Sequence, residues 1–351
     1  MADRFFTAIF SASRADALIG QIQAGLGAAL LSADTALVLA DEACGQALID
    51  RIAAWLAQEM GREAVLALPA LGREGDQAQV QIMLGQTGAS AFGPLSDWSF
   101  DTLSQVMKAE MGGSCLVSAD PRMPFFPQRL QLMQEASGAY LLGAMGAPSG
   151  SYKGPSGLSF GLGSPIIAQT FPGVERLDQD WIITAAEGQV IQEINQRPAL
   201  DVLKEVAGEI LARKLDQLPS FLYAAFPVSE ASPEDFLVRR INGLGRRSGS
   251  FSVEDEVLPG MPLAFARRNG PFVHQTLKQG IEDLRQRAGK PPRGAIYLYD
   301  HRRSVDFEGA TGEVALVKEA LGDIPLIHGA GQGVIGHNRF YALASQLIFI
   351  L

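Results

Sequence analysis

The sequence is poor in cysteine and in positive charge, and each shortage excludes a class of protein. Cys44 and Cys115 are the two cysteines among 351 residues, and neither belongs to a Cys-x-x-Cys pair. We therefore expect reduced thiols in a cytoplasmic protein and not a disulfide framework. The formal net charge is -9, from 29 basic and 38 acidic residues. An acidic chain gains no counterion release on a phosphate backbone, so we expect no nucleic acid partner.

Long uncharged hydrophobic runs are also missing. No stretch approaches the roughly 18 apolar residues that a membrane-spanning helix needs, so we expect no contact with a membrane. Asp3, Arg4 and Arg14 interrupt the apolar N-terminal stretch, which therefore does not predict a signal peptide. Apolar residues make up 47% of the chain and charged residues 19%, a composition that indicates a folded globular protein.

One sequence pattern occurs three times. Each copy has a short apolar run ending in an aspartate (Asp41, Asp120 and Asp300), a polar loop and a stretch with helical spacing. A second apolar run, a turn of glycine or other small residues and a third run follow. We predict a further helix before each copy, at about 14–31, 100–111 and 274–288. The pattern predicts an α/β fold of mixed sheets with flanking helices, internally repeated modules and two related domains.

Two hairpins are predicted between the second and third copies. The first has its turn at Glu187-Gly188 and leads into a helix that starts near Pro198. The second has its turn at Asn269-Gly270, because Asn-Gly is a strong hairpin signal, and leads into a helix from about Gln275. The proline-rich stretch 219–233 indicates a boundary between domains 1–218 and 219–351.

Several motifs, in this order, resemble the FIST family of intracellular ligand-sensing proteins. Asp120-Pro121 follows a strand, and Leu142-Gly143-Ala144 stands where the family has a glycine pair. Residues 184–200, TAAEGQVIQEINQRPAL, resemble a characteristic run of the family, and residues 327–336, IHGAGQGVIG, resemble its C-terminal Gly-rich turn. The resemblance covers roughly 14–350 and makes 1–218 similar to the N-terminal FIST domain and 219–351 to the C-terminal one.

The resemblance implies a non-enzymatic, cytoplasmic sensor of a small metabolite, such as an amino acid or a derivative. It also implies a signalling partner such as a histidine kinase or a cyclase. Carboxylates and guanidiniums at the ends of strands can bind an amino-acid-like ligand, and bare glycine backbone can line a cleft. We expect two facing walls between the domains. One wall comprises Asp120, Gly143, Gly146 and Ser149; candidates for the other are Asp300, His301, Arg302, Arg303, His328, Gly329, Gly331 and Gly333.

Two other functions remain open. One is a haem-binding nitric-oxide sensor that uses one of the four histidines, His274, His301, His328 or His337; the other is an enzyme acting on an amino-acid derivative. The histidine spacings match no zinc motif, so we predict no metal site, no catalytic residue and no cofactor other than the haem of that alternative. Residues 331–336 match G-x-G-x-x-G, but the dinucleotide fingerprint needs a helix next. Residues 338–351 could form a helix or a strand, and the FIST resemblance implies a strand.

Overall fold

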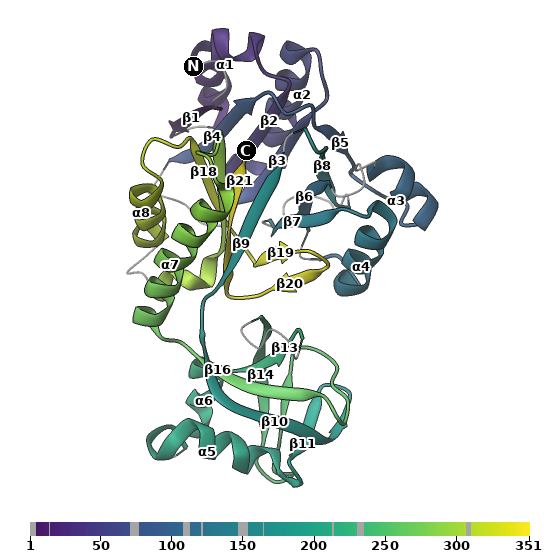
Figure 1. The fold of residues 1–351 in the computed structure, drawn as a ribbon, viewed down its shortest axis with the longest axis vertical. Helices are drawn as coiled ribbons and strands as arrows, with labels where there is room; N and C mark the ends of the chain where they lie inside the picture. Colours follow the sequence, from purple (N-terminus) through teal and green to yellow (C-terminus); the bar gives the residue numbers. More distant parts are fainter. Residues whose placement is uncertain are drawn as a thin grey trace. The chain divides into compact units, whose positions relative to one another are not determined.

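The computed structural model describes residues 5–13, 15–70, 77–107, 113–120, 122–146, 154–163, 165–212, 214–229, 235–306 and 310–351. The chain is a mixed α/β protein, as expected, and divides into two compact units (Figure 1). Unit 1 contains Met1–Phe171 and Thr276–Leu351, and unit 2 contains Pro172–Gln275. The expected boundary at 218/219 therefore falls inside unit 2, where Pro219 lies in the first turn of the short helix α6 (Leu218–Phe221). Proline is tolerated in that turn because the first helical N–H groups have no partner within the helix.

Unit 1 consists of three copies of one module, which confirms the predicted repeat. Each module runs strand, helix, strand, helix, strand, strand, and the four strands form one sheet. In the first module the strand order is β1-β4-β2-β3. Its elements are β1 (Phe6–Ala12), α1 (Ala15–Leu31), β2 (Thr35–Asp41), α2 (Gly45–Met60), β3 (Val65–Ala70) and β4 (Ala78–Gly85).

The second and third modules repeat this order, as β5-β8-β6-β7 and β9-β21-β17-β18. In all three the two strands joined through a helix are parallel, and the last strand runs antiparallel to the first of that pair. The second module comprises β5 (Ser90–Phe92), α3 (Phe100–Met107), β6 (Ser114–Ala119), α4 (Phe126–Ser137), β7 (Tyr140–Met145) and β8 (Ser156–Phe160). The third comprises β9 (Ile166–Pro172), α7 (Gly270–Ala288), β17 (Gly294–Asp300), α8 (Ala310–Leu321), β18 (Leu326–Gly331) and β21 (Ala344–Ile350).

The third module carries two insertions. Unit 2 is inserted between β9 and α7, and the hairpin of β19 (Val334–Gly336) and β20 (Arg339–Tyr341) lies between β18 and β21. Strand β19 pairs with β7, so this hairpin extends the sheet of the second module. The expected strand in 338–351 is confirmed, and because no helix follows the G-x-G-x-x-G run, that run lacks the helix N-terminus that binds a pyrophosphate.

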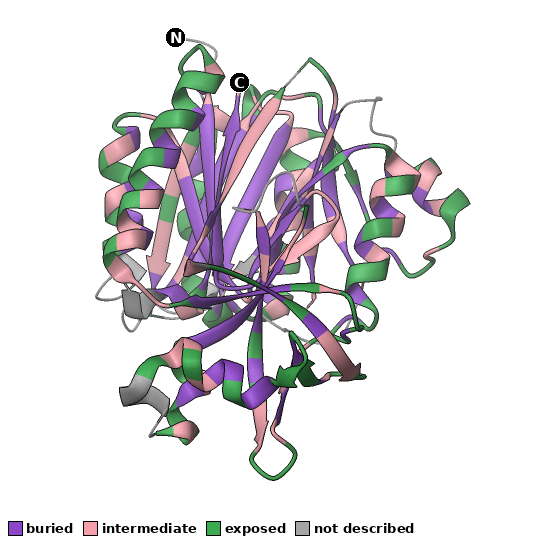
Figure 2. Cartoon of the chain, turned by 60° about the horizontal axis from the view of Figure 1, so that its bottom comes forward, coloured by how far each residue is buried: buried purple, intermediate pink, exposed green. Residues whose placement is uncertain are grey.

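The three sheets share one apolar core, because their central strands are apolar on both faces. Leu39 of β2, Leu142 of β7 and Leu298 of β17 all belong to it. Figure 2 shows the strands of unit 1 largely buried, while the helices keep exposed outer faces. Burial of the strands on both sides explains why they read as continuous apolar runs in the sequence.

Unit 2 is a seven-stranded antiparallel sheet of order β10-β16-β13-β14-β15-β11-β12, which closes on itself because β10 also pairs with β11. Trp181, Phe251 and Phe265 fill its core together with Leu200 and Leu203 of α5. The elements are β10 (Glu175–Glu187), β11 (Val190–Ile194), β12 (Arg197–Pro198), α5 (Ala199–Ala212), β13 (Leu222–Pro227), β14 (Phe236–Gly245), β15 (Ser250–Val253) and β16 (Pro262–Arg267).

One predicted hairpin is confirmed and the other is wrong. Glu187 pairs with Val190 across a two-residue turn in which Gly188 has φ +57°, and α5 starts at Ala199. At the second position β16 has already ended, and Asn269 instead caps helix α7: the Phe272 N–H donates to Asn269 Oδ1 (3.4 Å). Asparagine is favoured both in tight turns and at helix N-caps, so the local signal does not separate the two.

Both cysteines are free thiols, as expected, and both are buried. Burial raises the pKa of Cys44 to about 12 and that of Cys115 to about 11. Neither thiol is therefore activated at neutral pH. In the part of the chain that the structure describes, no helix has both the length and the apolar character needed to cross a bilayer.

Candidate functional site

The C-terminal ends of the parallel strands of modules two and three lie side by side in unit 1. Gly146 N–H donates to the Ala119 carbonyl (3.0 Å), and Gln332 N–H donates to the Met145 carbonyl (2.9 Å). At the end of β17, His301 Nδ1 lies 3.1 Å from the oxygen of Gly331. The ends of β6, β7, β18 and β17 thus form one continuous edge. This edge gathers most of the predicted ligand-binding residues: Asp120, Gly143, Gly146, Asp300, His301, Arg302, Gly331 and Gly333. Ser149 lies outside the described residues.

The glycines on this edge allow backbones to meet. A Cβ on Gly143, where φ is +132°, would lie 2.0 Å from the Val117 carbonyl oxygen, and one on Gly331 would lie 2.5 Å from that of Met145. Gly333, with φ +138°, packs against the ring of Phe340. The two walls expected for a ligand site therefore contact each other directly here through hydrogen bonds. The glycines allow this close approach because they carry no Cβ.

Two of the repeat-ending aspartates hold an arginine two residues later in the same geometry. Asp120 accepts hydrogen bonds from Arg122 N (2.8 Å) and Arg122 Nε (2.9 Å), and Asp300 accepts them from Arg302 N and Arg302 Nε (both 2.9 Å). In each pair the arginine Nη2 reaches the second carboxylate oxygen, at 2.5 Å and 2.6 Å. Alignment of the three repeats could have revealed this Asp-x-Arg motif, which the first copy lacks after Asp41.

These arginines keep both carboxylates ionised. The side-chain bonds from Arg122 hold the pKa of Asp120 below its usual range. Burial alone would raise the pKa of Asp300, but the hydrogen bonds and charge of Arg302, with the N–H of Leu343, lower it overall. The side chains of His301 and Arg302 remain 46% and 27% exposed, so the surface end of this edge is polar.

Arg303 lies in the interior instead of facing a ligand. Its fully buried side chain donates from Nε (2.8 Å) and Nη2 (2.5 Å) to Glu313 Oε1, which also accepts the Tyr297 hydroxyl (2.6 Å). Arg303 Nη1 donates to the Leu343 carbonyl (3.3 Å), while Leu343 N–H donates to Asp300 Oδ2 (2.8 Å). Leu343 is a buried residue with φ +53°, so Asp300 and Arg303 together hold its strained peptide in place.

His328 and Gly329 also lie inside unit 1, where β18 meets the first module. His328 is 5% exposed, and burial lowers its pKa to about 4, so the imidazole is neutral at pH 7. Its backbone exchanges two hydrogen bonds with the side chain of Gln81 (3.1 and 2.9 Å). A Cβ on Gly329 would lie 3.2 Å from Leu39, so both residues support packing between modules. Among the described residues, no three His, Cys, Asp or Glu side chains are placed to hold a metal ion.

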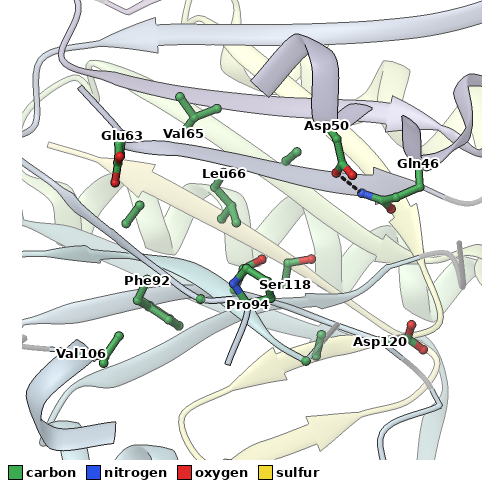
Figure 3. A pocket seen from close by; sticks show the side chains of 16 residues that line it. Gln46, Asp50, Glu63, Val65, Leu66, Phe92, Pro94, Val106, Ser118 and Asp120 are labelled. Carbon is green, nitrogen blue, oxygen red and sulfur yellow. Dashed lines mark hydrogen bonds between the residues drawn. The ribbon is translucent and has the colours of Figure 1, made fainter. Parts of the chain in front are cut away.

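A pocket of about 490 Å³ lies between modules one and two in unit 1 (Figure 3). Among the predicted site residues that the structure describes, only Asp120 lines it. The small side chains of Ala67, Ala91 and Ala119, from strands of both modules, leave space along its wall. The other lining residues are Gln46, Asp50, Glu63, Val65, Leu66, Phe92, Gly93, Pro94, Val106, Ser118, Gly154 and Ser156.

Two glycines shape one side of this pocket. Gly93 and Gly154 have φ of +84° and +83°, and added Cβ atoms would lie 2.4 Å from the Pro155 carbonyl oxygen and 2.0 Å from that of Leu95. The two segments can therefore cross closely only as bare backbone. Asp50 and Gln46 belong to α2 and share a hydrogen bond (2.6 Å). Sequence reasoning missed them because they look like any solvated helix face.

In sequence, the chain is similar to mycobacterial proteins whose names state no role. No protein-family model matches it, so the FIST resemblance stays a prediction. It is 26% identical to "Uncharacterized protein Rv0628c" of Mycobacterium tuberculosis (strain ATCC 25618 / H37Rv), over 54% of this chain and 52% of that protein. It is 27% identical to "Uncharacterized protein Mb0898c" of Mycobacterium bovis (strain ATCC BAA-935 / AF2122/97), over 54% and 50%. The matched region thus spans about half the length of these relatives.

Among solved structures, the chain is similar to the cyanuric acid hydrolase from A. caulinodans. The TM-score is 0.31 at 9% identity, with 99% of both chains covered. A second cyanuric acid hydrolase has a TM-score of 0.28 at 10% identity. Similarity at this level supports no conclusion about activity.

Proposed function

We propose that this chain is a non-enzymatic sensor that binds a small metabolite in the pocket between modules one and two. The pocket itself carries the proposal: its volume of about 490 Å³ lies within the range of about 300–1,000 Å³ typical of small-molecule sites. Its lining combines apolar side chains, which could cover a ligand's body, with polar ones, which could fix its orientation. The FIST resemblance supports an amino acid or a derivative as the ligand, a cytoplasmic location, and a signalling partner such as a histidine kinase or a cyclase.

The chemistry of Asp120 and of the other described lining residues favours binding over catalysis. A general acid that works at neutral pH needs a raised pKa, but Arg122 holds the pKa of Asp120 down. The described lining includes no histidine, cysteine or lysine that could serve as a base or nucleophile. A ligand here would contact β3 of one module and β5 and β6 of the next. It would therefore shift the packing of two modules if it bound one arrangement more tightly than another.

A thermal-shift screen of the whole chain with amino acids, dipeptides and amines tests this proposal. A true ligand at a hundred times its dissociation constant should stabilise the protein by about 2.7 kcal/mol. Ala67→Phe and Ala91→Phe each add a ring inside the pocket and should abolish the shift while the protein stays folded. Gln192→Phe, in a separate hollow of unit 2, is the matched control and should leave the shift unchanged. A hit that binds both filled variants as well as wild type would refute the pocket as the site.

A further inference from the structure

Buried glutamine side chains bridge two of the boundaries between modules. They stand at one position of the fourth strand, opposite the residue two before the repeat-ending aspartate: Gln81 in module one and Gln346 in module three. Gln81 Nε2 donates to the His328 carbonyl (2.9 Å), and its Oε1 accepts the His328 N–H (3.1 Å). Gln346 Oε1 accepts the Gly143 N–H (3.2 Å), and its Nε2 donates to the Ile335 carbonyl (3.0 Å). Each amide therefore gives one acceptor and one donor to backbone groups at a boundary.

The N–H groups that these amides bind belong to one position of the module. His328 of β18 and Gly143 of β7 each pair with the residue three before the aspartate, and Ala67 of β3 has the same place in module one. The Ala64 carbonyl accepts the Ala36 N–H of β2 (2.9 Å). Because the backbone groups of a strand alternate between its two sides, the N–H and carbonyl of Ala67 point away from β2. Ala67 therefore offers the same outward pair of groups that His328 offers to Gln81.

The corresponding glutamine is missing in module two. The residue two before Asp120 is Ser118, and its partner on the fourth strand is Ser156, whose side chain ends before the place where a glutamine carries its amide. Ser156 and Ala67 both line the pocket, where β3 contacts β8. Strand β3 ends its sheet, and in the described part of the chain no group bonds to the outward N–H and carbonyl of Ala67. The pocket therefore lies where the other two boundaries hold a glutamine amide.

We infer that the pocket takes a small molecule with an uncharged primary carboxamide, which binds Ala67 as Gln81 binds His328. The ligand's oxygen accepts the Ala67 N–H, and its nitrogen donates to the Ala67 carbonyl. A carboxylate offers acceptors without a donor, and an ammonium group offers donors without an acceptor. Leu66 and Phe92 provide apolar surface for the rest of the molecule.

This inference rests on the proposed function, since it names the ligand class of the same site. It narrows the expectation of an amino acid or derivative to those that carry a carboxamide, such as glutamine or the amide of an amino acid.

Isothermal titration with matched probes tests the inference. The compounds 3-phenylpropanamide, N,N-dimethyl-3-phenylpropanamide and 3-phenylpropionate share one body and differ in the group that meets Ala67. The dimethyl amide keeps the acceptor without an N–H, and the carboxylate has no donor. We expect the primary amide to bind at least about tenfold more tightly than either, because each analogue leaves the Ala67 carbonyl unpaired. Glutamine and glutamate repeat the comparison on the body of an amino acid.

The variant Ser156→Gln supplies the third glutamine from within the chain. Its amide should take the place of the ligand, weaken binding of the primary amide by more than about tenfold, and raise the melting temperature by about 2–4 °C. Ser156→Leu fills a similar volume without an amide and should not raise the melting temperature. Ser220→Gln, at an exposed position of α6 in unit 2, is the matched control and should change neither binding nor melting temperature.

The N–H of Ala67 can also be observed directly in protein labelled with ¹⁵N-alanine. Its NMR signal, identified by its absence in Ala67→Gly, should move downfield when the primary amide binds, because the N–H gains an acceptor. The signal of Ala264 in unit 2 should stay in place. If Ser156→Gln does not fold, this signal and the probe series decide the question.

The outcomes separate this inference from the proposed function. If the dimethyl amide or the carboxylate binds as tightly as the primary amide, and Ala91→Phe excludes them, the carboxamide assignment is overturned and the pocket remains the ligand site. Primary amides that bind a folded Ser156→Gln as well as wild type, or leave the Ala67 signal unmoved, would also overturn it. If no probe binds but the wider screen finds a ligand that Ala91→Phe excludes, the carboxamide inference alone fails. A blank result in both experiments would remove the proposed function as well.

Discussion

Replacement of Arg303 by methionine should destabilise unit 1 severely. The guanidinium and the carboxylate of Glu313 are both 0% exposed, and two of the arginine N–H groups bond to one carboxylate oxygen. Methionine fills a similar volume but leaves Glu313 charged and buried without its counterion. Breaking a buried pair from one side costs about 3–5 kcal/mol. The Leu343 carbonyl loses its donor as well, so the upper part of that range is expected.

Urea denaturation, followed by tryptophan fluorescence, measures this loss. Trp181 lies in unit 2, so a Trp181→Phe background leaves Trp55 and Trp98 to report on unit 1. The double variant Arg303→Met/Glu313→Leu removes both charges and should recover at least half of the loss, because an apolar pair is tolerated where a lone charge is not. A loss below about 1 kcal/mol in Arg303→Met, or a double variant as unstable as the sum of its singles, would refute the reasoning.

Three further predictions follow from single positions. Gly143→Ala should lower the free energy of unfolding by more than about 4 kcal/mol or prevent folding, because its Cβ would lie 2.0 Å from a backbone oxygen. Gly20→Ala, in α1 with open space around it, is the control and should raise the free energy of unfolding by about 0.5–1 kcal/mol. Equal effects of the two changes in chemical denaturation would contradict this prediction. Gln196→Gly should stabilise unit 2 by up to about 1 kcal/mol in thermal unfolding, because exposed Gln196 has φ +62° in the two-residue β11–β12 turn. A decrease in the stability of unit 2 would show that the side chain of Gln196 matters more than the conformation of its backbone. The pKa of His328 is 6.5 in the unfolded chain and about 4 in the folded protein, so between these values the unfolded chain binds more protons. The contribution of His328 to stability is therefore complete above pH 6.5, and the free energy of unfolding should fall by up to about 3 kcal/mol as the pH is lowered to 4. Urea titrations at several pH values should show this slope in the wild type and a flatter one in His328→Gln.

The repeated module has a physical consequence for where ligands can bind. The parallel strands of the second and third modules end on one edge, but the inserted hairpin β19–β20 pairs with β7 and fills that edge with backbone. Between the first and second modules, strands and loops that carry alanine and glycine line a pocket. A pocket large enough for a ligand therefore lies where modules one and two pack through small residues, and not at the glycine-rich motif of residues 331–336.

Local sequence determined most of the elements of this protein. Apolar runs that end at Asp41, Asp120 and Asp300 predicted the central strands, because burial on both faces leaves no room for polar residues. The alternation of apolar runs with stretches of helical spacing predicted the module, and its three occurrences in the sequence predicted three copies of it. The Glu187-Gly188 turn was also readable, since a two-residue hairpin with a glycine at positive φ has few alternatives.

Tertiary structure alone decided the site and the division of the chain. Unit 2 interrupts the third module between β9 and α7, and no local signal marks that β9 pairs with β21, far away in the sequence. Arg303, adjacent to the surface residue Arg302, is buried because α8 brings Glu313 to it. Asp50 joins Asp120 at one pocket because α2 of the first module and the end of β6 of the second lie around the same volume. Sequence patterns report the period and polarity of one segment, whereas the neighbour of a side chain depends on how distant segments pack.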